Sequence, residues 1–214
     1  TIIKDFPPNI IGTPTDEWSW SAFGGRFGWP NAIVFHQQRM ILGGSSNQPQ
    51  TIWGSSIDKE AGVEDFTEGL EDDDAYEFTL AANKKNQISW MASNITLSIG
   101  TLGSEFAVSS SGSSITATDV NIEQIGQYGS AANTAPLIAN GFTVFNQAGG
   151  RKLRELRYDY NSERNFARDL NKTAEHIVDD GIKQISYQAE PYQIVWTIIG
   201  NELYALTYET EEDV

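Results

Sequence analysis

The sequence predicts an all-β fold in which small antiparallel sheets repeat as β-propeller-like blades, about four of them in this chain. Two dipeptides that tolerate positive φ, Asn140-Gly141 and Gly200-Asn201, each separate two strand-like runs and are typical of tight hairpins. Apolar, strand-like segments also recur every 47 to 56 residues. They centre on Ile41, Leu97, Val144 and Trp196. A long period made of several short strands is typical of a ring or array of blades.

Each repeat unit contains three or four short runs that are rich in β-branched and aromatic residues, the composition of strands. The expected strands are 32–36, 38–42 and 50–55 in the first unit, 87–91, 95–99, 105–108 and 120–125 in the second, 136–139, 142–145 and 152–160 in the third, and 182–187, 194–199 and 202–208 in the fourth. One sheet cannot cover both of its own apolar faces, so neighbouring units must do so.

Helix is expected in one place, a short connector over residues 173–179. Thr173 is its expected N-cap, and Gly181 lies just beyond its end. The connector joins the third repeat unit to the fourth.

Residues 1–30 differ from the rest of the chain, because they hold four of its seven prolines and a cluster of tryptophans and phenylalanines. This composition predicts an extended strap, or the end of a preceding domain, followed by the propeller over residues 31–214. The sequence begins with Thr1 rather than methionine. This start favours a piece of a longer protein, in which the four blades are part of a larger ring, over a small complete ring.

The composition restricts the function. The 214 residues carry a formal net charge of −15 and no cysteine, which excludes disulfides, thiolate metal sites and a cysteine nucleophile. No run approaches the roughly 18 apolar residues of a membrane span, so no membrane anchor is expected. Phosphate binding needs clustered Lys and Arg, and the one basic run, residues 151–157, alternates as a strand does and divides its bases between two faces.

Few residues suit catalysis or metal binding, and we expect no enzymatic activity, no metal and no cofactor. His36 and His176 lie 140 residues apart and are expected to be structural or exposed. The acidic run Glu71-Asp72-Asp73-Asp74 lacks the spacing of a calcium-binding EF-hand loop and is expected to be a solvated loop. The glycine-rich segment 24–28 lies in no strand-to-helix context, so a phosphate loop is not expected there.

One block of the first unit is more specific than composition. The segment 30–55 contains Gln38-Arg39 followed by Gln50-Thr-Ile-Trp-Gly-Ser55, and it resembles a segment of the tail nozzle proteins of short-tailed bacteriophages, also called tail tubular protein B. The resemblance continues at 64–66 and at 72–75 and returns farther along the chain. These later segments are 127–130, 149–156 and 188–196, so the resemblance covers about residues 18–210.

This resemblance implies a structural role and no catalytic residues. Family members carry the propeller inside a longer chain, and six copies form the terminal tube through which the phage genome leaves. It implies self-association in a hexameric ring, contact with other tail proteins, and DNA that passes without specific binding. The expected location is the virion tail of a phage or prophage, after synthesis in the cytoplasm of the bacterial host.

A second class of function stays open, a surface-binding propeller that recognises a glycan or a receptor protein. Exposed aromatic side chains would favour it, and Trp18, Trp20 and Trp29 are the candidates. We expect these three tryptophans to pack against the blades instead. A glycosidase is a weaker third alternative, because 29 acidic residues allow many carboxylate pairs.

Overall fold

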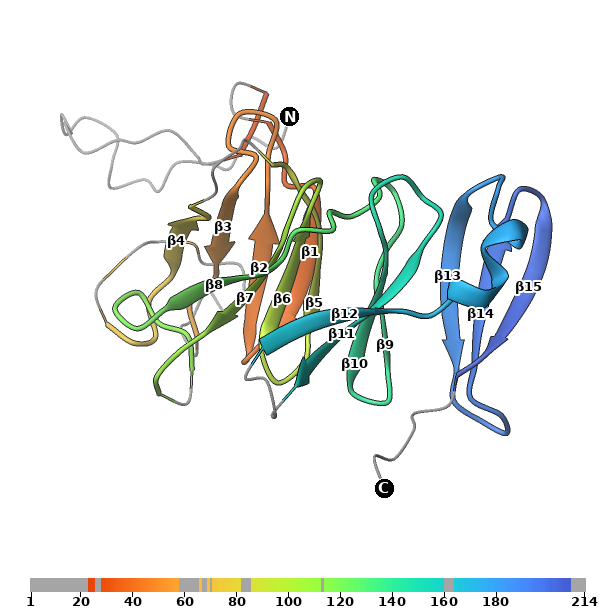
Figure 1. Ribbon diagram of the computed structural model, residues 1–214. Helices are drawn as coiled ribbons and strands as arrows, with labels where there is room; N and C mark the ends of the chain where they lie inside the picture. The colour runs from red at the N-terminus through yellow and green to blue at the C-terminus, as the bar shows by residue number, and fades with distance from the viewer. Residues whose placement is uncertain are drawn as a thin grey trace, which may run out of the picture.

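The computed structural model describes residues 23–25, 28–57, 66, 69, 71–81, 86–112, 114–159 and 164–208. These residues form four antiparallel sheets, which follow one another along the chain (Figure 1). Blade one contains β1 (Ala32–His36), β2 (Arg39–Gly43), β3 (Thr51–Gly54) and β4 (Tyr76–Thr79). Blade two contains β5 (Ile88–Ser93), β6 (Leu97–Thr101), β7 (Glu105–Ser109) and β8 (Asn121–Gly126).

The other two blades complete the described part of the chain. Blade three contains β9 (Leu137–Ala139), β10 (Phe142–Asn146), β11 (Leu153–Asp159) and β12 (Arg164–Asp169). Blade four contains three strands, β13 (Ile182–Gln188), β14 (Ile194–Ile199) and β15 (Glu202–Thr207). Among the described residues, no helix is long and apolar enough to cross a membrane.

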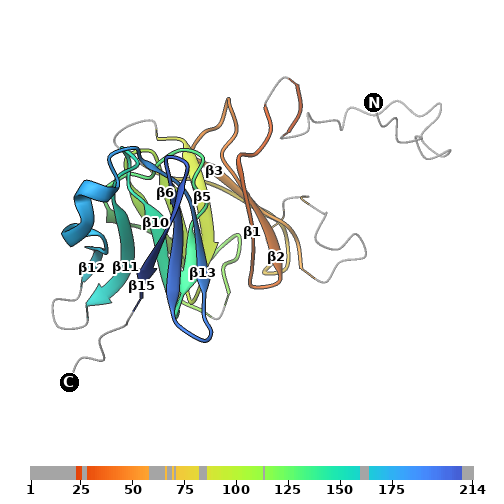
Figure 2. The ribbon, with the colours of Figure 1, turned by 90° about the vertical axis from the view of Figure 1, so that its right-hand side faces the viewer.

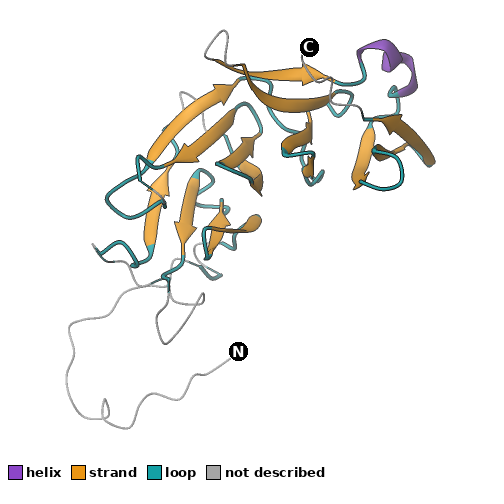
Figure 3. Ribbon diagram, turned by 90° about the horizontal axis from the view of Figure 1, so that it is seen from below, coloured by secondary structure: helices purple, strands orange, loops and turns teal. Residues whose placement is uncertain are grey.

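Every blade is an up-and-down sheet whose strands pair in the order in which they occur in the sequence. The first strands β1 and β5 are neighbours, as are β9 and β13, and the outer strands β8 and β12 also touch. The blades therefore stand one after another as an open arc (Figure 3). The all-β, propeller-like fold predicted from the sequence is confirmed.

The repeat period found in the sequence corresponds to one strand position that recurs in each blade. The four apolar centres lie on β2, β6, β10 and β14, the second strand of each sheet. Ile41, Leu97 and Val144 are fully buried there. A second strand has a hydrogen-bonded neighbour on each side and a blade over at least one face, so it carries the strongest apolar signal.

Apolar side chains fill each space between neighbouring blades. The core between blades one and two contains Ile41, Ile52, Leu97, Ile99 and Phe106. The core between blades two and three contains Trp90, Ala92, Phe145 and Ala167. The core between blades three and four contains Val144, Leu153, Val195 and Ile199. The blades are thus held together face to face, as the repeat predicted.

Both predicted hairpin turns are present. Asn140 and Gly141 have φ of 48° and 83° and join β9 to β10, and Gly200 has φ of 60° and joins β14 to β15. A third turn of this kind was missed, because it is made by Gln37 and Gln38, with φ of 48° and 65°. Glutamine is not a residue that signals positive φ, so Gln38 was wrongly placed in a strand.

Three other expectations need correction. The connector is a 3-10 helix over Lys172–Ile177, and its N-cap is Asn171 rather than Thr173. The strands β4 and β12 were not predicted, because each alternates with polar residues at the outer edge of a blade. Ile95 was placed in a strand but lies in the turn between β5 and β6, where it is 91% exposed.

Candidate functional site

The most highly organised polar group in the described residues surrounds Arg39, the first residue of β2. Its side chain is buried, with 1% of its surface exposed. One guanidinium nitrogen, Nη1, donates to the backbone carbonyls of Ser55 at 2.5 Å and Asp74 at 2.7 Å. The other, Nη2, donates to the carbonyl of Asp72 at 2.5 Å, and the guanidinium lies 5.2 Å from the centre of the Tyr76 ring. Arg39 therefore joins the end of β3 to the loop before β4.

The electrostatics of this cluster follow from burial. Desolvation lowers the pKa of Arg39, while Tyr76 and the nearby carboxylates of Asp72, Asp73 and Asp74 act in the opposite direction. Burial also raises the pKa of Tyr76 to about 12. An arginine starts from a pKa so high that it keeps its charge in such a site. The cluster is a fixed positive charge surrounded by carbonyl dipoles.

The acidic run Glu71 to Asp74 thus contributes its backbone to the fold. Its side chains are exposed or half-buried, which agrees with the expected solvated loop, while two of its carbonyls bind Arg39. Asp74 also accepts a hydrogen bond from the backbone N–H of Glu71 at 2.9 Å. In the part of the chain that the structure describes, no three histidine, aspartate or glutamate side chains group as metal ligands.

The two histidines are structural or exposed, as expected, and the fold does not bring them together. His36 is buried at the end of β1, and its Nδ1 lies 2.8 Å from the hydroxyl oxygen of Ser93 on blade two. Burial lowers the pKa of His36. His176 is exposed in the 3-10 helix.

Two buried carboxylates were not identified from the sequence. Glu105, on β7, accepts a hydrogen bond from the backbone N–H of Tyr128 at 3.2 Å, and its Oε1 has no partner. Burial raises the pKa of Glu105 to about 7, although the Tyr128 hydrogen bond and the charge of Arg154 act in the opposite direction. The sequence does not predict the burial of Glu105, because this residue is the first of its strand and lies beside a turn.

The second buried carboxylate, Glu155 on β11, joins two blades. It accepts hydrogen bonds from Arg157 and from the hydroxyl of Tyr208, the latter at 2.9 Å, and Tyr208 follows the last strand of blade four. Burial raises the pKa of Tyr208. The sequence does indicate the burial of Glu155, since strand alternation places it on the same face as the apolar Leu153 two residues earlier.

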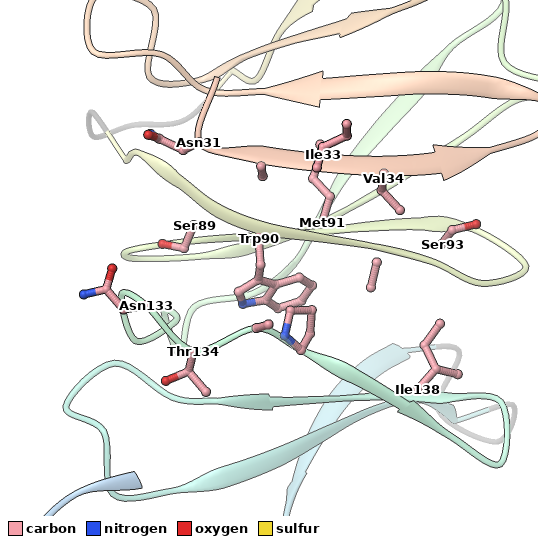
Figure 4. Close-up of a pocket in the computed structure, with 14 residues that line it drawn as sticks. Asn31, Ile33, Val34, Ser89, Trp90, Met91, Ser93, Asn133, Thr134 and Ile138 are labelled. Carbon is pink, nitrogen blue, oxygen red and sulfur yellow. The ribbon is translucent and has the colours of Figure 1, made fainter. Parts of the chain in front are cut away.

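A groove of about 670 Å³ lies along the first strands of blades one, two and three. Its polar lining comes from Asn31, Ser89, Ser93, Asn133 and Thr134 (Figure 4). Trp90 lies in the middle of this lining, is 3% exposed, and has an indole N–H without a hydrogen-bond partner. The groove therefore offers neutral donors and acceptors and no charged side chain.

The four bases of the run 151–157 are all engaged by other groups. Arg151 pairs with Asp179 at 3.4 Å, and Lys152 pairs with Asp169 at 3.0 Å and Glu175 at 2.9 Å. Arg154 donates to the Ala167 carbonyl and lies over the Tyr128 ring, and Arg157 pairs with Glu155. Arg151 and Lys152 precede β11 (Leu153–Asp159), so only Arg154 and Arg157 can alternate on the strand as expected. All four bases have partners among the described residues.

The N-terminal aromatic residues are only partly described. Trp18 and Trp20 lie outside the described residues. Phe23 packs edge to face on Trp53 at 4.9 Å, as a strap over blade one would. Trp29 is 69% exposed, so the expectation that it packs against the blades is wrong.

Comparisons with known proteins give little beyond the fold. No family model matches the chain, and no curated protein matches it. Among solved structures, a luciferin-regenerating enzyme covers 84% of this chain and 71% of its own, at 10% sequence identity and a TM-score of 0.30. A similarity of this size says nothing of activity.

Replacing Arg39 with methionine is expected to destabilise blade one. Methionine has an apolar side chain of similar length, but it leaves the carbonyls of Ser55, Asp72 and Asp74 without their donor. The expected loss in the free energy of unfolding is about 2–5 kcal/mol, measured by urea denaturation. Arg39→Lys keeps the charge but loses the fork of donors, so its free energy of unfolding should lie between those of the wild type and Arg39→Met. The matched control is Arg151→Met, at an exposed ion pair, and it should leave stability unchanged; an equal loss in both variants would contradict the role of Arg39.

The buried carboxyl of Glu105 is expected to make stability depend on pH. Its pKa is raised from 4.5 to about 7 in the folded protein, so the folded state binds this proton more tightly than the unfolded chain. This contribution is complete below about pH 4.5 and is lost as the pH rises through about 7. Glu105→Gln removes this pH-dependent contribution. The free energy of unfolding of the variant, relative to that of the wild type, should therefore rise by about 3 kcal/mol as the pH increases from 4.5 to about 7. Urea denaturation across this range measures the gain; the exposed Glu123→Gln is the control, and parallel pH profiles of Glu105→Gln and wild type would contradict the prediction.

Proposed function

We propose that this chain is a structural β-propeller module of a bacteriophage or prophage tail, in the nozzle through which DNA leaves the virion. The observation that carries the proposal is the cluster around Arg39. The motif residues through which the chain resembles the tail nozzle proteins include Arg39, Ser55, Asp72 and Asp74, and the fold joins these residues by hydrogen bonds. The shared motif is thus used to build a blade, which supports a structural role.

The arrangement of polar groups also supports a protein without enzymatic activity. The buried charge of Arg39 is held by backbone carbonyls, and that of Glu155 by Arg157 on the same strand and by the hydroxyl of Tyr208. Neither opens into the groove. We propose accordingly that the protein associates with copies of itself and with other tail proteins in the virion, after synthesis in the host cytoplasm.

Electron microscopy with gold-labelled antibodies tests the proposed location. Antibodies raised against this chain are expected to label the free end of the tail in virions produced by the source bacterium. Antibodies first absorbed with the pure protein serve as the control and should give no label. Virions that stay unlabelled while the same antibodies detect the protein in the host cell extract would contradict the proposal.

A second candidate function, recognition of a glycan, is favoured by the groove beside Trp90. A neutral lining of amides and hydroxyls suits the hydroxyl groups of a saccharide. Titration calorimetry with a panel of saccharides tests it. Binding that Asn133→Ala abolishes would favour this function over the nozzle.

The protein is expected not to bind DNA at physiological salt. Its net charge of −15 repels phosphate, and the bases of the run 151–157 are engaged by acids, by a carbonyl and by an aromatic ring. A mobility-shift assay at low salt and at about 0.15 M salt should therefore show no retardation. The control replaces Arg151, Lys152 and Arg154 with alanine. Retardation that survives physiological salt and is lost in this triple variant would overturn the argument.

A further inference from the structure

The groove beside Trp90 runs along the edges of strands rather than over the face of a sheet. Its lining includes the successive residues Asn31 to Val34, in and just before β1, and Ser89 to Ser93 on β5. Successive side chains of a strand point to opposite faces, so a groove that all of them line follows the edge of the strand. β1 and β5 are edge strands, each paired on one side only, with β2 and β6. Main-chain N–H and C=O groups on their free sides therefore face the groove.

The groove crosses three blades. β5 lies in its middle, between β1 on one side and the segment that leads into β9 on the other (Figure 4). In Figure 2, which looks along the row of blades from blade four, β5 and β13 stand to the right of β6 and β15, so these first strands share one side of the arc. The groove lies on the outer face of neither end blade, so it does not depend on whether further blades precede or follow this chain.

The edge of β5 is open to pairing. An edge strand is a template for another strand unless a charge, a proline or a bulge protects it. No charged side chain lines the groove, and β5 contains no proline. The register shift in its pairing with β6 lies at its start, between Ile88 and Trp90. β9 differs, because it has three residues and follows Pro136, which has no N–H to donate. An additional strand can therefore pair beside β5 from Trp90 to Ser93.

The two walls on either side of β5 carry exposed apolar side chains. Ile33 on β1 is 59% exposed, and Ile138 on β9 is 43% exposed. Both line the groove. A strand added to β5 turns its side chains alternately toward the wall of Ile33 and the wall of Ile138. Such walls suit β-branched side chains, whereas a charged side chain would lose hydration there without gaining an opposite charge.

We propose that this groove binds an extended, uncharged segment of a partner protein, which adds to blade two as a further strand beside β5. Main-chain hydrogen bonds to β5 supply affinity, and contacts of alternate side chains with Ile33 and Ile138 supply specificity. A saccharide, the second candidate above, uses the same polar lining, but its hydroxyl groups do not reproduce the regular donors and acceptors of a strand. The inference does not depend on the proposed function in a phage tail.

A short neutral peptide is the first probe. It alternates threonine and valine, has six residues as β5 has, and is blocked by an acetyl group and an amide at its ends. Titrated into the isotope-labelled protein, it is expected to shift the backbone NMR signals of residues Trp90 to Ser93 and to slow hydrogen exchange of the amides on the free edge. Unchanged signals at the highest soluble peptide concentration would overturn the proposal.

Methylation of the peptide's own amides separates strand addition from other modes of binding. Two further versions of the peptide carry N-methyl groups on alternate amides, one set in each version. Only every second amide of an added strand faces β5, so one version should bind about tenfold more weakly or worse, and the other should bind almost as the parent does. An equal loss in both versions, or a loss in neither, would contradict pairing with β5.

Substitutions on the two walls test the position of the peptide. Ile138→Asp and Ile33→Asp each place a carboxylate beside the bound strand, and each should weaken binding of the parent peptide about tenfold or more. The matched control is Ile95→Asp, because Ile95 is 91% exposed in the turn after β5 and lies outside the groove; its affinity should equal that of the wild type. Circular dichroism establishes which variants are folded. Unchanged affinity in a folded wall variant would overturn the proposed position.

Calorimetry with neutral saccharides separates the two ligands of the groove. A saccharide that binds, in a protein that ignores the peptide, would overturn the proposal and favour the second candidate function. Peptide binding that no saccharide displaces supports the proposal. Both results are independent of the antibody labelling that tests the location in the tail.

Discussion

Burial of sheet faces between neighbouring blades is the constraint on which the rest of this structure depends. A three- or four-stranded sheet has two faces, and each blade here covers one apolar face of the next. Ile41, Leu97 and Val144, on the second strands, have no exposed surface because they lie in this packing. Each apolar cluster among the described residues contains side chains of two blades, so neighbouring blades stabilise one another as in other repeat proteins.

Buried polar groups fix how the blades and loops are joined. Arg39 gathers three carbonyls from the end of β3 and the loop before β4, and Glu155 accepts a hydrogen bond across the space between blades three and four. His36 contacts Ser93 across the space between blades one and two. Such contacts are directional, whereas apolar packing tolerates small shifts, so they select one arrangement among several that bury similar area.

The sequence predicted the blades better than it predicted the connections between them. Second strands such as β10 were found because covered strands are continuously apolar, and Asn140-Gly141 was found because its turn chemistry is local. The turn at Gln37 and Gln38 was missed, because its positive φ is imposed by surrounding structure, including a hydrogen bond from the Ile115 N–H to the Gln37 side chain. The cluster at Arg39 was also beyond reach, because its three carbonyl partners belong to the backbone and leave no trace in residue type.

Charge and apolar surface act in opposite directions at the ends of the arc. A net charge of −15 on each copy makes any approach of two copies unfavourable at long range, and salt screens this repulsion within about 8 Å at physiological ionic strength. Apolar burial at faces such as that of Trp196 and Leu203 acts only at contact and does not depend on screening. Association of copies would therefore strengthen as salt is added, whereas association with a nucleic acid would weaken. The sign of the salt dependence of association therefore distinguishes a second copy of the chain from a nucleic acid. This difference follows from the acidic composition of the chain.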